Sequence, residues 1–129
     1  MRNFHDELKI LMDDFVFRVY EATKKFPKEE LYGLTSQLRR AVLSVILNYI
    51  EGYARQRKDV LKNFIEISYG SLKETKYLLY PPTFQNTPPK GGRIYFSYRQ
   101  KYLDEKEYKE LIEKADKIGK MLWGVLKKL

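Results

Sequence analysis

The fold follows from residues 36–55, whose sequence is SQLRRAVLSVILNYIEGYAR. Apolar residues recur in this stretch every three or four positions, as on one face of an α-helix; they are Leu38, Ala41, Val42, Val45, Tyr49 and Tyr53. Further apolar residues lie on the other faces, namely Leu43, Ile46, Leu47 and Ile50. A helix that is apolar nearly all round needs burial on more than one side, and one small bundle supplies only one. The second set therefore predicts a subunit interface.

Three more amphipathic helices are expected around this one. The first carries an apolar stripe from Phe4 to Tyr20, with charged residues on its other face, and stops at Pro27 because proline disfavours helix in the residue before it. The last begins at Asp104 and Glu107, which have capping-box spacing. The third follows Asp59, its expected N-cap, and its expected inward stripe is Val60, Phe64, Ile67, Ser68, Ser71, Leu72, Thr75 and Leu79. Helices of about 20 residues with short connections favour antiparallel neighbours. The prediction is one all-α domain over residues 1–129, an antiparallel up-down four-helix bundle.

The connections are predicted from glycine, proline and threonine. Gly33 is expected to close the turn after Pro27 in the left-handed conformation, and Thr35 to cap the next helix. Gly70 is expected to permit close helix approach. Residues 81–95, rich at first in proline, glycine and threonine, predict a long loop inserted between the third and fourth helices.

The composition limits the cellular location and the kinds of site that the protein can have. No cysteine is present, so disulfides and thiolate sites are excluded, and the acidic residues near the N-terminus do not fit a signal peptide. No run approaches the ~20 apolar residues of a membrane span. A cytoplasmic protein is expected. The 25 basic and 17 acidic residues give a formal net charge of +8, which favours polyanionic partners.

Several motifs resemble a known family. The run from Phe26 to Ala41, FPKEELYGLTSQLRRA, followed by Ser44, Asn48, Glu51, Gly52 and Tyr53, closely resembles the four-helix bundle proteins encoded within intervening sequences of 23S rRNA genes. The stretch Gly70-Ser71-Leu72 with Glu74, and the run from Ala115 to Leu122, are similar to later helices of that family. The resemblance implies a ring-like homopentamer. It also implies kinship with the accessory variability proteins of diversity-generating retroelements, which bind a reverse transcriptase and nucleic acid.

The chain departs from the family pattern in two places. Ile46 and Leu47 stand where the family usually has a proline and small residues. The family pattern would run almost directly from Tyr80 to Phe96, so Pro81 to Tyr95 resembles an insertion. This insertion either lengthens the turn after the third helix or interrupts that helix.

Catalytic and metal sites have little support in the sequence. His5 is the only histidine and has no converging ligands, and the serines lie on helices without a histidine to activate them. We therefore expect no enzyme activity, no metal and no cofactor.

Basic residues are the candidate nucleic-acid contacts. They form three groups, which are Arg39 with Arg40, then Arg55, Arg57, Lys58 and Lys62, then Lys90, Arg93, Arg99 and Lys101. A ring of subunits would repeat the second group around one rim, where it would contact phosphates without reading sequence. A solvated helix end is the alternative. In the third group, rings such as Phe84, Tyr95 and Tyr98 either stack single-stranded bases or pack the end of the bundle.

A polar stripe crosses the same helix. Arg40, Ser44, Asn48 and Glu51 follow one another at four- and three-residue steps, and Gln37 belongs to the same polar set. Buried polar groups need partners, so these residues either bond neighbouring helices or subunits, or form a shared site for a ligand or RNA.

Charge and resemblance together predict a non-catalytic, homo-oligomeric accessory protein that associates with structured RNA or an RNA–protein complex. A reverse transcriptase or another protein is a further possible partner. The alternative is an oligomeric protein-binding scaffold without a nucleic-acid role.

Overall fold

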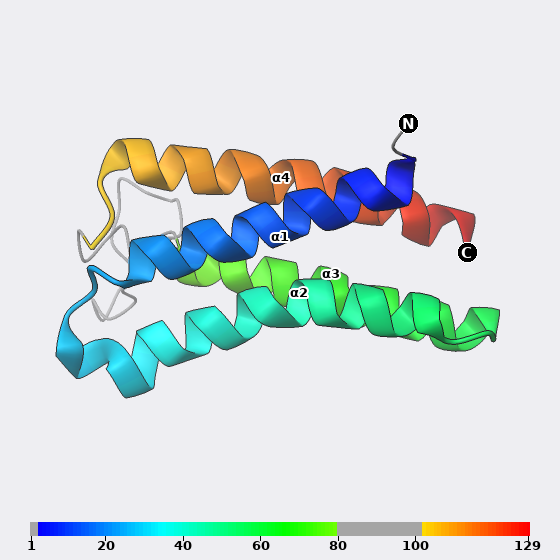
Figure 1. The fold of residues 1–129 in the computed structure, drawn as a ribbon, viewed down its shortest axis with the longest axis horizontal. Coiled ribbons are helices and arrows are strands. Elements are labelled where there is room, and N and C mark those ends of the chain that lie inside the picture. Colours follow the sequence, from blue (N-terminus) through cyan, green and yellow to red (C-terminus); the bar gives the residue numbers. More distant parts are fainter. Residues whose placement is uncertain (1–2, 80–101) are drawn as a thin grey trace, which may run out of the picture.

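The computed structural model describes residues 3–79 and 102–129. Within them lie four α-helices, which are α1 (Phe4–Thr23), α2 (Ser36–Ala54), α3 (Lys58–Leu79) and α4 (Glu105–Lys128). Two short helical segments, η1 (Lys28–Glu30) and η2 (Leu31–Thr35), connect α1 to α2, and these ranges contain no strand. Consecutive helices run in opposite directions, and each packs on two others around a common core (Figure 1). The predicted antiparallel four-helix bundle is confirmed. The predicted loop at 81–95 falls outside the described residues.

The core is built from one apolar stripe of each helix. Leu8, Met12, Phe15 and Val19 of α1 are fully buried, and α4 contributes residues at the same three- and four-residue spacing. The expected stripe of α3 was wrong at one position. Ile65 is the buried residue and Ile67 is 43% exposed, because two positions along a helix turn a side chain by about 200°.

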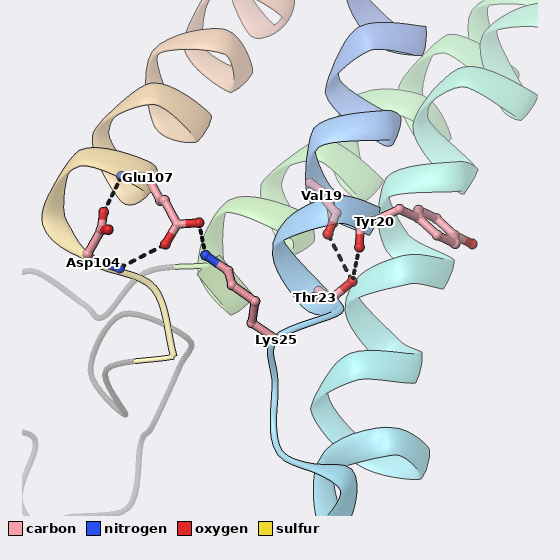
Figure 2. Close-up of polar contacts among 6 residues, drawn as sticks. All are labelled: Val19, Tyr20, Thr23, Lys25, Asp104 and Glu107. Carbon is pink, nitrogen blue, oxygen red and sulfur yellow. Dashed lines mark hydrogen bonds and ion pairs between the residues drawn. The ribbon is translucent and has the colours of Figure 1, made fainter.

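A side-chain contact joins the C-terminal end of α1 to the first turn of α4 (Figure 2). Asp104 and Glu107 form the predicted capping box, and Lys25 pairs with Glu107. The Thr23 hydroxyl donates to the carbonyls of Val19 and Tyr20, so the last turn of α1 has a side-chain partner. The Lys25–Glu107 pair joins the chain at the end of α1 to the start of α4.

The start of α2 differs from the prediction. The π-type turn η2 runs directly into α2, so Thr35 already has helical angles (φ −59°, ψ −49°) and makes no capping bond. Gly33 has φ −114°, outside the left-handed region. The carboxylate of Glu30 instead accepts a bond from the Leu34 amide at 3.3 Å. Both predictions, the Thr35 cap and the left-handed Gly33, were wrong.

Close packing of α2 on α3 depends on small residues. The Ser68 hydroxyl donates to the Val45 carbonyl at 2.6 Å, across the interface. The glycine that permits close approach is Gly52, where an added Cβ would lie 2.9 Å from the Cβ of Phe64. A Cβ at Gly70 would meet nothing within 4 Å, so the role expected of Gly70 was wrong. Within the described part of the chain, no helix is long and apolar enough to cross a membrane.

Candidate nucleic-acid interface

The second basic group surrounds the junction of α2 and α3. Arg55 ends α2 by taking an extended conformation (φ −90°, ψ 150°), and α3 begins three residues later at Lys58. Asp59 lies inside the first turn of α3 rather than before it, so it is not the N-cap that the sequence suggested. The four basic side chains lie in the connection between the helices and in the first two turns of α3, and Gly52 lets α2 and α3 approach closely beside them.

Acidic neighbours partly balance this group. Arg55 pairs with Glu51 and stacks over the ring of Phe64, 5.4 Å from its centroid. Arg57 pairs with Asp59 at 2.8 Å. All four cations of the group are exposed. Surface ion pairs of this kind contribute little energy, so an incoming phosphate can compete for the guanidinium groups.

The fold adds two lysines that sequence reasoning missed. The C-terminus of α4 lies at the same end of the bundle as the α2–α3 junction, which is the right-hand end of Figure 1. Lys127 and Lys128, both exposed, therefore join the junction group. We call this set the basic end; it consists of Arg55, Arg57, Lys58, Lys62, Lys127 and Lys128. The first turn of α1, with Asp6 and Glu7, also lies at this end. These segments are far apart in the sequence and lie at one end of the bundle because of the antiparallel topology. No local sequence pattern therefore indicated that they belong to one surface.

Arg39 and Arg40 have different surroundings. The guanidinium of Arg39 donates to the Thr23 hydroxyl at 2.8 Å and lies over the Tyr20 ring, 4.8 Å from its centroid. It therefore links α2 to α1. Arg40 is exposed on the outer side of α2. The third basic group, Lys90, Arg93, Arg99 and Lys101, lies outside the described residues.

Two members of the polar set of α2 form hydrogen bonds with α3. Asn48 donates to both the carbonyl and the hydroxyl of Ser44 at 2.8 Å, and the Ser71 hydroxyl of α3 donates to the same Ser44 hydroxyl at 2.8 Å. Gln37 donates to Glu74 of α3 at 3.3 Å. Ser44 and Gln37 thus have partners on α3, whereas Glu51 pairs with Arg55.

The outer sides of α1 and α2 carry exposed apolar residues. On α2, Leu47 is 57% and Ile50 is 48% exposed, Leu43 is half-buried, and Ile46 packs partly on the core. On α1, Ile10 and Phe17 are exposed on the face that the sequence predicted to be charged. They are seven residues apart, so a search for spacing on the polar face could have found them.

A separate cluster of charged side chains joins α1 to α4. Asp14 of α1 pairs with Lys114 of α4 at 2.8 Å and with Arg18 at 2.9 Å. The hydrogen bond from Lys114, supported by Arg18, lowers the pKa of the Asp14 carboxyl below its ordinary value of 3.8. Across residues 3–79 and 102–129, no three His, Asp or Glu side chains gather in an arrangement that could hold a metal ion.

Comparison with known proteins identifies the family. A family model described as 23S rRNA-intervening sequence protein matches residues 9–82, more than half of the 129 residues. The similarity noted at Ala115 to Leu122 lies beyond the matched range. A comparison with curated proteins gave no match. Since the match takes in most of α1, the connection to α2, and all of α2 and α3, the chain belongs to the 23S rRNA-intervening sequence protein family.

Proposed function

We propose that this protein is a cytoplasmic, non-catalytic homo-oligomer that associates with structured RNA, or with an RNA–protein complex, through its basic end. The observation that carries the proposal is that the α2–α3 junction and the last turn of α4 lie at the same end of the bundle (Figure 1). Six exposed cations from the α2–α3 connection, α3 and α4 lie at this end, with Glu51 and Asp59 as the acidic partners at the junction. Lysine and arginine at such a surface supply phosphate contacts that do not depend on base sequence.

Oligomer formation would multiply this surface. Leu47 and Ile50 are exposed on α2, and Ile10 and Phe17 are exposed on α1. An α2 face of one subunit against an α1 face of the next would bury both apolar sets. Such a head-to-tail contact closes into a ring when its rotation allows, and the family resemblance leads us to expect five subunits.

RNA binding measured against salt concentration tests the proposal. Each lysine that contacts a phosphate contributes about one unit to the slope of log K against log salt. The variant Lys58→Gln with Lys62→Gln should bind a structured RNA more weakly and with a slope smaller by about two. The control, Lys24→Gln with Lys106→Gln at the opposite end, should retain the wild-type slope. Equal slopes for all three proteins would contradict an RNA-binding role of the basic end.

A protein-binding scaffold is the second candidate, and the exposed apolar side chains of α1 and α2 favour it. These residues would then face a partner protein, such as a reverse transcriptase, rather than another subunit. This alternative would be supported if the protein binds a purified partner at high salt and binds no RNA.

A further inference from the structure

Two clefts at the basic end share one pair of aromatic rings. His5, from the first turn of α1, and Tyr53, from the last turn of α2, have ring centroids 4.6 Å apart. One cleft, of about 450 Å³, extends from these rings and Phe4 across α4, where its lining includes Lys120, Met121 and Lys128. We call it the aromatic cleft. A second cleft, of about 400 Å³, lies on the α2 side of the same rings and includes Lys9 and Ile50.

The rings are held in place from behind. The ring of buried Tyr49 packs against the ring of Tyr53, with centroids 4.9 Å apart and an interplanar angle of 31°. Burial raises the pKa of the Tyr49 hydroxyl, and this hydroxyl is hydrogen-bonded to Nδ1 of His5 at a distance of 2.5 Å. A ring surface fixed in this way loses little conformational freedom when a ligand binds.

The lining of the aromatic cleft suits a flat ligand with negative charge beside it. Most of the lining is apolar, and Phe4, His5 and Tyr53 present ring surface to it. The charged residues of the lining are Lys120 and Lys128, and it includes no carboxylate side chain. A nucleobase stacks on aromatic rings whatever its sequence, and its phosphates are attracted to lysine ammonium groups.

The cleft is continuous with the proposed RNA surface. Tyr53 precedes Arg55 by two residues, and Lys128 belongs both to the basic end and to the cleft lining. We propose that the aromatic cleft takes up an unstacked base from a single-stranded end of a bound RNA, stacking it beside Tyr53 with its phosphates near Lys120 and Lys128. This inference rests on the proposed function and adds a preference for single-stranded ends.

The test compares two RNAs that differ only at one end. A blunt hairpin probes the phosphate contacts, and the same hairpin with a short single-stranded adenosine overhang probes the cleft. Base stacking on an aromatic side chain contributes about 1–3 kcal/mol, so the overhang should improve affinity by roughly 5- to 150-fold. The variant Tyr53→Leu should lose most of this gain and keep its affinity for the blunt hairpin. Tyr53→Phe should retain the gain, because it keeps the ring.

A matched control and a second measurement keep the test independent of folding. Tyr32 is 93% exposed and belongs to η2 at the opposite end, so Tyr32→Leu should bind both RNAs as the wild type does. In the unaltered protein, a 4-thiouridine placed in the overhang and irradiated should crosslink to peptides that contain Phe4, His5 or Tyr53. Crosslinks confined to other peptides would overturn the inference.

The outcomes separate the two proposals. If neither RNA binds the wild type, the proposed function is wrong and this inference falls with it. If the blunt hairpin binds with steep salt dependence and the overhang adds no affinity, only the aromatic cleft proposal is wrong. Equal losses for both RNAs in Tyr53→Leu would assign Tyr53 a structural role and would also overturn the cleft proposal.

Discussion

Two glycines provide the sharpest test of how α2 packs on α3. Replacing Gly52 with alanine adds a Cβ 2.9 Å from Phe64 Cβ and 3.1 Å from a methyl group of Leu61. Overpacking of this kind costs about 1–3 kcal/mol, and the higher helix propensity of alanine offsets about 1 kcal/mol of that cost. Gly52→Ala should therefore destabilise the protein by up to about 2 kcal/mol.

Gly70→Ala is the matched control. Gly70 is also inside a helix, but its added Cβ would meet nothing within 4 Å, so only the helix-propensity gain of about 1 kcal/mol remains. The two variants should differ by about 1–3 kcal/mol in their free energy of unfolding, which is roughly 4–11 °C in Tm for a chain of this length. Thermal and urea unfolding at one fixed protein concentration would measure the difference, since association makes Tm concentration-dependent. A Gly52→Ala protein as stable as Gly70→Ala would refute the close approach at Gly52.

Three further predictions follow from the helix ends, the ion pairs and the outer faces. Asp104→Ala removes a capping box and should cost about 1 kcal/mol of unfolding free energy, measured by urea titration; no loss would contradict the cap. The pKa of Asp14 is lowered in the folded protein, so its stabilisation is present above the ordinary value of 3.8 and is lost as pH falls through the folded pKa. The stability gap between wild type and Asp14→Asn should therefore be full at neutral pH and narrow below pH 3.8, and a gap independent of pH would argue against the Lys114 pair. Leu47→Asp should lower the oligomer mass in light scattering, whereas Leu31→Asp at the opposite end should not; an unchanged mass in Leu47→Asp would place that residue outside the interface.

The sequence was sufficient for the features that local rules determine. Apolar spacing located the four helices, and the spacing of Asp104 and Glu107 identified a capping box that the structure contains. Local rules failed where the spacing of apolar residues allows more than one buried stripe. In α3, the spacing is consistent with an apolar stripe that contains either Ile67 or Ile65. Packing against the other helices buries Ile65.

Tertiary arrangement also decided the points that the sequence missed. Thr35 has the residue type of an N-cap, but η2 continues into α2 and removes the helix end that it would have capped. The nearness of Lys128 to Tyr53, and the bond between His5 and Tyr49, join segments that lie far apart in the chain. Sequence spacing within one helix carries no information about such contacts.

Light scattering with and without a structured RNA, at low and moderate salt, tests the central claim most directly. The account predicts an oligomer, with the mass of a pentamer, that gains RNA mass at low salt and loses it steeply as salt rises. Two results would contradict it: an oligomer whose mass does not change when RNA is added at either salt concentration, or a monomer under all of these conditions.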